Sequence, residues 1–338
     1  MRVLITGGQG RVGTPVSQKF VANGWDVRVI SVEPKSALDG VSYAQCDILD
    51  YDAVREQVKG CDAVVHLAAI PSPRSHPAPE MFNINVSGTY NIYEAAAQAG
   101  IKRVVQASSI NALGCFWGDD DRRFEYFPID EDHPNYTTDG YSFSKEVVED
   151  IAAYYWRRDG ISGTSFRFPA VWTQDIVALG NLSERFAEKR QFLQDFLNLP
   201  KSEQEQQLAD ARATALEGRA NRILEYAASQ SGLSAKHTFS DDPLWSAYMH
   251  DRYNFWAYIH TDDSTQAIEK AITADYEGSH PLFVNSDSNS LNMDTEILLG
   301  LFFPDVTKRA KPIQGADTLV SFDKARDLIG YEPTWRLS

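Results

Sequence analysis

A glycine-rich segment near the start of the chain, Thr6-Gly-Gly-Gln-Gly-Arg-Val-Gly13, constrains the fold more than any other stretch. It follows a short β-branched run and opens a helix-like one. Gly7, Gly10 and Gly13 recur at every third residue, which allows a tight turn, close approach of a pyrophosphate and close packing of the helix on the strand. The N–H groups at a helix N-terminus favour such an anion. The segment therefore predicts a dinucleotide-binding βαβ unit, with a glycine-rich turn that binds nothing as the alternative.

Strand-like and helix-like runs alternate through the first half of the chain. Strands are predicted at Arg2–Thr6, Asp26–Val32, Ser42–Cys46, Ala63–Ala69, Arg103–Ser109 and Gly163–Phe168. Helices are predicted at Pro15–Asn23, Asp52–Lys59, Asn85–Ala99 and Ser142–Arg158. This alternation is typical of right-handed βαβ units and of a parallel sheet covered on both faces. We predict an α/β fold of Rossmann type, a doubly wound parallel sheet with a smaller, mostly helical C-terminal substrate domain.

The sequence changes character after Trp172. From about residue 180 to 232 it is rich in Glu, Gln, Arg, Ala and Leu, which predicts a helical insert with Ser202-Glu-Gln-Glu205 as a capping box. The insert is either a set of helices packed over one end of the sheet or a lid over a substrate. The strand–helix pattern returns at 255–271. We predict a dinucleotide-binding domain at 1–172, to which 255–271 returns, and a substrate-binding domain at 173–254 and 272–338.

Charge and cysteine content exclude several classes of protein. The chain carries 47 acidic and 32 basic residues, a net charge of −15, which disfavours binding to nucleic acid or to an anionic membrane surface. Its three cysteines form no Cys-x-x-Cys pattern, which is typical of reduced thiols in a cytoplasmic protein. The histidines lack metal-ligand spacing, so we expect no metal. Apolar runs are too short for a signal sequence or for a membrane span of roughly 18 residues.

Tyr141 and Lys145, in the run Gly140-Tyr-Ser-Phe-Ser-Lys145, stand one helical turn apart. Residues at i and i+4 share one helix face. A nearby cation favours phenolate over phenol, which would make Tyr141 a usable base. The spacing alone is a weak signal, so the rest of the chain must decide between catalysis and coincidence.

With this pair, the glycine spacing resembles that of the extended short-chain dehydrogenase/reductase family, which includes NAD-dependent nucleotide-sugar epimerases and dehydratases and the uronate dehydrogenases. Further stretches carry the likeness: Cys46-Asp-Ile-Leu49, His66-Leu-Ala-Ala69, Asn85-Val-Ser-Gly-Thr89, Ala107-Ser-Ser-Ile-Asn111, Tyr258-Ile-His-Thr-Asp-Asp263 and Asp323-Lys-Ala-Arg-Asp-Leu-Ile-Gly-Tyr331. The likeness is weakest through the insert. It implies NAD(P)-dependent hydride transfer at a secondary alcohol.

The resemblance also implies a set of cofactor contacts. These are Gly7, Gly10, Arg11, Val12, Gly13, Ser31, Glu33, Asp47, Ile48, Leu67, Ala68, Ala69, Asn85, Tyr141, Lys145, Pro169 and Val171. Ser31 stands where the family places the Asp that binds the adenosine ribose of NAD. Glu33 can take that role, Lys35 can instead meet the 2′-phosphate of NADP, and both can be plain loop residues. We predict NAD, with NADP as the alternative.

The same resemblance assigns catalytic roles to Ser109, Tyr141 and Lys145. Ser109 would hydrogen-bond the substrate oxygen, Tyr141 would exchange its proton, and Lys145 would bind the ribose and lower the pKa of Tyr141. Asn111 is expected to face the same pocket, with a loop-stabilising amide as the alternative. Arg167 is expected in an internal ion pair.

Ile110 and Asn111 stand where dehydratases of the family carry an Asp and a Glu, so elimination is not expected. Three substrate contacts of the nucleotide-sugar members are also missing from this chain, one of them an arginine without a match near Lys311-Pro-Ile-Gln-Gly315. Trp256 replaces an arginine that clamps the diphosphate, and Ala170 replaces an asparagine that meets the nucleotide sugar. We therefore predict a smaller sugar, uronate or polyol substrate that contacts Ser109, Asn111, Ala170 and Trp256.

Two alternatives stay open: a UDP-sugar 4-epimerase with tightly bound NAD, and a dinucleotide-sensing scaffold without turnover. Arg122, Arg123 and Arg252 are candidates for an anion contact, with solvated surface charges as the other interpretation. Family members dimerise through helices that match Asn85–Ala99 and Ser142–Arg158, so the resemblance also implies a homodimer.

Overall fold

The fold is built on one seven-stranded sheet. In the computed structural model, which describes residues 1–118, 121, 124–230 and 242–337, all neighbouring strands of this sheet are parallel, in the order β3-β2-β1-β4-β5-β6-β9. The strands are β1 (Arg2–Thr6), β2 (Asp26–Ser31), β3 (Ser42–Gln45), β4 (Ala63–His66), β5 (Val104–Ala107), β6 (Gly163–Arg167) and β9 (Ser279–Phe283). The predicted doubly wound parallel sheet is confirmed.

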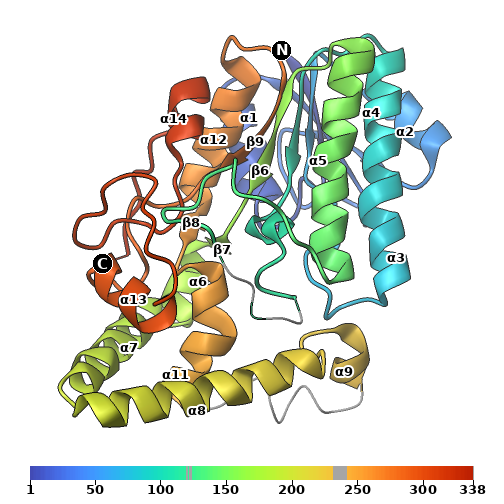
Figure 1. Cartoon of the computed structure of the whole chain (residues 1–338). Coiled ribbons are helices and arrows are strands. Elements are labelled where there is room, and N and C mark those ends of the chain that lie inside the picture. The colour runs from blue at the N-terminus through green and yellow to red at the C-terminus, as the bar shows by residue number, and fades with distance from the viewer. Residues whose placement is uncertain (119–120, 122–123, 231–241, 338) are drawn as a thin grey trace.

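Helices cover both faces of the sheet (Figure 1). One layer holds α1 (Gly13–Ala22), α12 (Thr261–Thr273) and α14 (Asp323–Ile329), and the other holds α2 (Tyr51–Val58), α4 (Gly88–Gln98) and α5 (Gly140–Asp159). Side chains of β1 alternate between the two cores: Val3 and Ile5 pack in the first layer, and Leu4 packs in the second. Because both faces are buried, the central strands are continuous apolar runs.

Several element boundaries differ from the prediction. The predicted helix Asn85–Ala99 begins as a π-helical turn, Asn83–Ser87, which continues α3 (Ala78–Phe82) and precedes α4. The capping box predicted at Ser202 is wrong, because α8 (Lys201–Ala220) begins directly after Pro200 and has no side-chain cap. Ser202 therefore lies inside the first helical turn.

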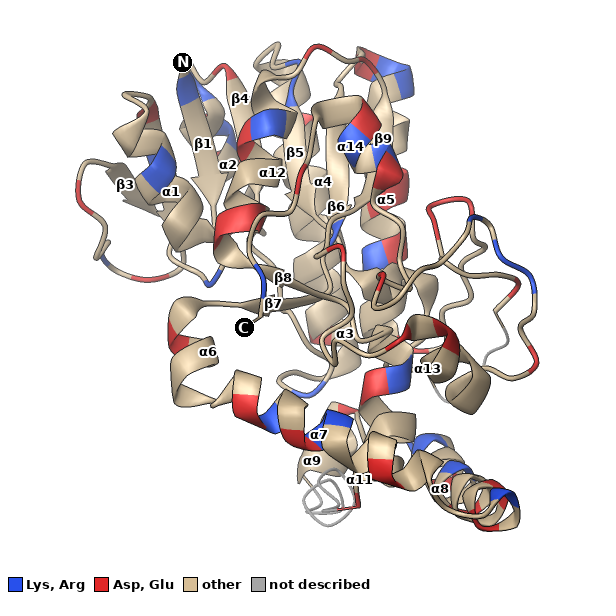
Figure 2. Ribbon diagram, turned by 90° about the vertical axis from the view of Figure 1, so that its left-hand side faces the viewer, with Lys and Arg blue, Asp and Glu red and all other residues tan. Residues whose placement is uncertain are grey.

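The C-terminal region packs below the carboxyl ends of the strands (Figure 1). Its helices are α6 (Gln174–Leu179), α7 (Leu182–Leu197), α8, α9 (Tyr226–Gln230), α11 (Pro243–Ser246) and α13 (Thr295–Phe302), with a π-helical turn Ala247–Asp251 and a 3-10 turn Arg252–Asn254. A separate two-stranded parallel sheet joins β7 (Ala170–Trp172) to β8 (Tyr258–His260). The surfaces of α7 and α8 carry charges of both signs (Figure 2). None of the described helices is long and apolar enough to cross a bilayer.

Candidate active site

A cavity of about 560 Å³ opens at the carboxyl ends of the central strands. It lies where the strand order reverses between β1 and β4, the position at which doubly wound sheets bind ligands. The predicted residues that line it are Gly7, Gly10, Arg11, Val12, Gly13, Leu67, Ala69, Ser109, Asn111, Tyr141, Lys145, Pro169, Ala170 and Val171. Residues distant in sequence thus line one cavity, and their roles there stay predictions.

The glycine loop forms the wall of the cavity at β1. Gly7 has a φ of +65°, and a Cβ there would lie 2.8 Å from the backbone N of Ala68. A Cβ on Gly13 would lie 2.2 Å from the carbonyl O of Gly7. Val12 provides no side-chain cap for α1, so no capping side chain competes with an anion at this helix N-terminus. This cradle fits the pyrophosphate of a dinucleotide.

His66, at the end of β4, hydrogen-bonds with residues on both sides of it. Its Nδ1 lies 2.7 Å from Thr6 Oγ1, and its Nε2 lies 3.0 Å from Thr89 Oγ1. Burial and, to a smaller extent, the positive charge of Lys145 lower the pKa of His66 to about 3. His66 is therefore neutral, and it ties β4 to β1 and α4 rather than acting as an acid or base.

The opposite wall carries Tyr141 and Lys145 from the first turns of α5. Burial raises the pKa of Tyr141 to about 12, while its hydrogen bond with Ser109 acts in the lowering direction. Burial lowers the pKa of Lys145 to about 8, and the Glu149 carboxylate opposes that change. Lys145 Nζ donates to the carbonyl of Ala107 at 3.0 Å and lies 5.9 Å from the centre of the Tyr141 ring. Asp139 also raises the pKa of Tyr141, and the lowering by Lys145 that the resemblance implies stays a prediction.

The two serines after β5 differ in their partners. Ser108 Oγ donates to Glu149 Oε1 at 2.6 Å, and Glu149 also accepts two hydrogen bonds from Arg167, at 3.0 and 2.8 Å. Ser109 Oγ instead accepts from the backbone N of Asn111 at 3.1 Å. Ser108 therefore bonds to a buried ion pair that joins α5 to the sheet, whereas Ser109 lies beside Tyr141. The ion pair expected for Arg167 is confirmed.

Some predicted cofactor residues lie outside this lining: Ser31, Glu33, Asp47, Ile48, Ala68 and Asn85. Ser31 ends β2, and its Oγ accepts from the backbone N of Glu33 at 3.3 Å. The Asn85 side chain is buried and bonds to the backbone of Ile70 and to Ser144 Oγ, so it joins a loop at the cavity to α5. Within the described chain, Asn85 therefore has a structural role and does not line the cavity.

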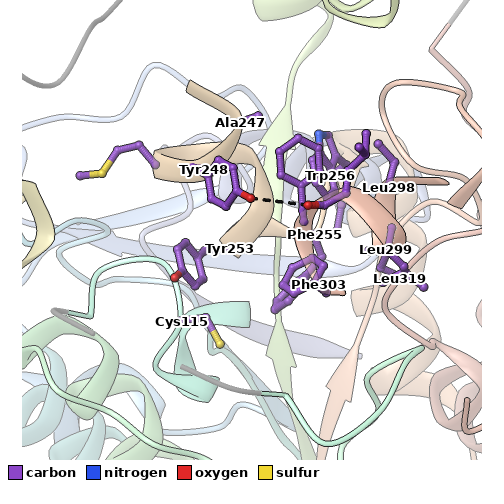
Figure 3. Close-up of a cluster of buried hydrophobic side chains, with 14 of the residues drawn as sticks. Cys115, Ala247, Tyr248, Tyr253, Phe255, Trp256, Leu298, Leu299, Phe303 and Leu319 are labelled. Atoms are coloured by element: carbon purple, nitrogen blue, oxygen red, sulfur yellow. Dashed lines mark hydrogen bonds between the residues drawn. The ribbon is translucent and has the colours of Figure 1, made fainter. Parts of the chain in front are cut away.

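Trp256, predicted to contact the substrate, does not line the cavity. Its side chain is buried in the C-terminal core (Figure 3). There, the centre of its ring lies 5.2 Å from that of the Phe302 ring. Phe255 and Trp256 adopt φ values of +56° and +48°, a left-handed conformation that bulky residues rarely adopt and that the sequence does not signal. Ala170, by contrast, lines the cavity from β7.

The candidate anion contact Arg252 also lies outside the cavity lining. Arg252 is buried and pairs with Asp121, while its Nε donates to the carbonyl of Phe302 at 2.8 Å. Arg122 and Arg123 lie outside the described residues. Within the described chain, no group of three or more His, Cys, Asp or Glu side chains is arranged to hold a metal ion.

Sequence reasoning missed the far end of the cavity, which is lined by Phe116, Trp117 and Asn254. The rings of Phe116 and Trp117 are perpendicular, with centroids 4.5 Å apart. The Trp117 ring also lies 6.4 Å from that of Tyr141, edge to face. These residues belong to irregular segments outside every motif, so no local pattern could have identified them.

Known proteins resemble this chain in sequence. The model of the NAD dependent epimerase/dehydratase family matches residues 3–183. Uronate dehydrogenase of Pseudomonas putida is 30% identical over 175 residues, covering 51% of this chain and 62% of that protein. The L-arabinose 1-dehydrogenase (NAD(P)(+)) of Haloferax volcanii is 34% identical over 181 residues, covering 52% of this chain and 69% of that protein. The match thus spans less than two thirds of the uronate dehydrogenase.

Solved structures share the fold over the whole chain. UDP-glucose 4-epimerase from Thermotoga maritima, solved with UDP-glucose, superposes with a TM-score of 0.62 at 18% identity, covering 100% of this chain and 95% of that one. A short-chain dehydrogenase/reductase superfamily protein from Agrobacterium tumefaciens, solved with NAD, gives a TM-score of 0.64 at 21% identity, covering 100% and 94%. With its glycine loop and Tyr141–Lys145 wall around one cavity, and with a family model that matches more than half of its length, the chain belongs to the NAD dependent epimerase/dehydratase family.

Proposed function

We propose that this chain is an NAD-dependent dehydrogenase that transfers a hydride from a secondary alcohol of a small, sugar-type molecule. The observation that carries the proposal is the placement of Ser109, Tyr141 and Lys145 on one wall of the cavity, across from the glycine loop. The family match and the names of the relatives, a uronate dehydrogenase and an L-arabinose dehydrogenase, support it. NADP remains the alternative cofactor, with Glu33 and Lys35 as the residues that would distinguish the two.

The residues of the chain supply proton transfer and positioning. NAD, when bound, supplies the hydride acceptor. Ser109 and Tyr141 would hold the reacting hydroxyl between them, and Tyr141 would take its proton. Because burial raises the pKa of Tyr141 to about 12, the phenol needs a neighbouring positive charge to lose its proton near neutral pH. Lys145, fixed by the Ala107 carbonyl, supplies such a charge.

The polar atoms at the far end of the cavity suit an uncharged polyhydroxyl substrate. Asn111 Oδ1 and Trp117 Nε1 are buried and have no hydrogen-bond partner among the described residues, although both side chains line the cavity. A substrate hydroxyl can donate to the first and accept from the second. In the described lining, the cations are Arg11, beside the glycine loop, and Lys145. We therefore expect neutral aldoses or polyols to be better substrates than uronates.

A cofactor-reduction screen tests the proposal. Purified protein would be mixed with NAD or NADP and with free aldoses, polyols or uronates, and formation of the reduced cofactor would be followed by absorbance. We expect reduction with at least one free sugar or polyol, and none with Tyr141→Phe. Interconversion of UDP-glucose and UDP-galactose without net reduction would replace the proposal with the epimerase alternative. Binding of NAD without any turnover would replace it with the scaffold alternative.

Assembly and location stay predictions. The helices expected to form a homodimer, α4 and α5, expose Tyr90, Phe143 and Tyr154. Large aromatic side chains on one exposed helical layer are compatible with such an interface. The three cysteines are buried and form no disulfide with one another, which is compatible with a cytoplasmic location.

A further inference from the structure

Helix α8 of the insert contacts the loop that forms the far wall of the cavity. This loop, residues 115–118, carries Phe116 and Trp117 and lies about a hundred residues before α8 in sequence. We propose that Arg219, on α8, is a positioning residue that fixes this aromatic wall and thereby sets the affinity for the substrate. The inference rests on the proposed function and deepens it by giving the insert a role at the same site.

The Arg219 side chain bonds to the loop backbone at three positions. Its Nη1 donates to the carbonyls of Cys115 at 3.1 Å and Gly118 at 2.8 Å, and its Nη2 donates to the carbonyl of Phe116 at 3.0 Å. A fourth bond, from Nη2 to the carbonyl of Met249 at 3.2 Å, ties the same guanidinium to the turn that follows α11. The bonds converge on the peptide units that carry the two aromatic side chains.

These contacts explain why a charged residue is buried there. Arg219 is 1% exposed, and its guanidinium stacks 3.7 Å above the centre of the Tyr253 ring. Its hydrogen bonds to the loop and to Met249 all end on backbone carbonyls rather than on carboxylates. Burying a cation is unfavourable unless several good hydrogen bonds compensate. A planar guanidinium with five donors can reach several carbonyls at once, which the three donors of an ammonium cannot match in this geometry.

A second arginine on the same face of α8 holds the chain just after this loop. Arg212 stands seven residues, or two helical turns, before Arg219. Its Nε donates to Asp121 Oδ2 at 2.9 Å. Asp121 also accepts from the Tyr253 hydroxyl at 2.5 Å and pairs with Arg252. Helix α8 therefore bonds to the loop itself through Arg219 and to Asp121, three residues after the loop, through Arg212.

The wall fixed in this way lies against the proposed catalytic residue. Trp117 packs edge to face with Tyr141, and Phe116 stands perpendicular to Trp117. Aromatic faces of this kind bind the apolar C–H face of a sugar ring. The insert is then neither a lid nor passive packing, because Arg219 of α8 fixes the substrate wall through its bonds to the loop backbone. Figure 1 shows α8 along the end of the molecule below the sheet.

The test compares Arg219→Met and Arg219→Lys with Ala215→Gly. Ala215 is buried one turn before Arg219 on α8, so its change to Gly weakens the helix without removing any bond to the loop. Hydrogen–deuterium exchange of the peptide that covers residues 113–118 reports on the loop without needing turnover. The affinity of each variant for NAD is measured as well. KM and kcat are measured with the sugar found in the screen.

We expect Arg219→Met to speed amide exchange in this peptide and to raise KM for the sugar by roughly tenfold or more, with NAD affinity within about twofold of the parent. Arg219→Lys should give an exchange rate and a KM between those of the parent and those of Arg219→Met. Ala215→Gly should leave exchange of the peptide unchanged. If Arg219→Met does not fold, the exchange rate of the same peptide in Arg219→Lys tests the inference instead. Unchanged exchange in a folded Arg219 variant, or equal exchange in Ala215→Gly, would overturn the inference. Because exchange needs no substrate, this result is independent of whether the proposed activity is found.

Discussion

The buried ion pair behind the active site gives the strongest stability prediction. Glu149 and Arg167 are 7% and 4% exposed at their side chains, and two hydrogen bonds join them. A third, from Ser108, ends on the same carboxylate. The change Glu149→Gln keeps the shape and one acceptor oxygen, but removes the charge and at least one charge-assisted bond, worth about 1.5–3 kcal/mol. It also leaves the Arg167 cation buried and unpaired. We therefore expect the free energy of unfolding to fall by about 3–5 kcal/mol.

The assay is urea unfolding followed by tryptophan fluorescence, read as the change in the free energy of unfolding. Arg167→Met and the double variant complete a mutant cycle, in which the double variant should cost less than the sum of the single ones by at least about 1 kcal/mol. Glu56→Gln, which removes an exposed ion pair with Lys59, is the matched control and should change little, because solvent screens that pair. A loss below about 1 kcal/mol for Glu149→Gln, or strict additivity in the cycle, would refute the reasoning.

Three further predictions concern the site. Tyr141→Phe should lower kcat by roughly a hundredfold or more while NAD affinity stays within about twofold, as measured by steady-state kinetics and titration calorimetry. Oxidation should accelerate as pH rises toward the pKa of Tyr141, about 12 in the folded protein. Lys145→Met removes the cation that favours the phenolate, so the pH–rate profile should move to higher pH; an unmoved profile would contradict that role. Gly13→Ala, whose Cβ would lie 2.2 Å from the Gly7 carbonyl, should abolish NAD binding in a fluorescence titration, whereas Gly300→Ala, with no atom within 4 Å, should not.

The sheet and the cofactor wall could be predicted because their signals are local. A strand, a glycine turn and a helix follow one another within residues 2–22, and the contacts that need Gly7 and Gly13 lie close by in the fold. Strand ends were less predictable: β4 was expected to reach Ala69 but ends at His66. Beyond this point the backbone N of Ala68 turns to the Thr6 hydroxyl at 3.1 Å instead of continuing the ladder. Such a side-chain acceptor on a neighbouring strand leaves no periodic pattern.

The substrate wall could not be predicted because its position depends on distant side chains. Phe116 and Trp117 lie in a loop without a motif, and Arg219 reaches them from the insert, the part of the chain with the weakest family resemblance. Trp256 is the opposite case, a residue that was predicted to lie in the site but does not. A motif spacing pointed to the site, but the left-handed backbone at Phe255 and Trp256 accompanies a ring packed in the core. Alignment to a motif gives a position along the chain and leaves the direction of the side chain undetermined.

The two halves of the cavity are therefore held by different kinds of contact. The cofactor half depends on backbone geometry, where an added Cβ at Gly7 or Gly13 meets main-chain atoms at less than 3 Å. The aromatic wall, which we propose contacts the substrate, is held by one side chain of α8, Arg219, which bonds to loop carbonyls. Substitutions in α8 can consequently reshape the substrate wall while the glycine cradle is unchanged. A chain built in this way can change its substrate through the insert and keep its cofactor, which is the behaviour expected where one redox fold serves many different sugars.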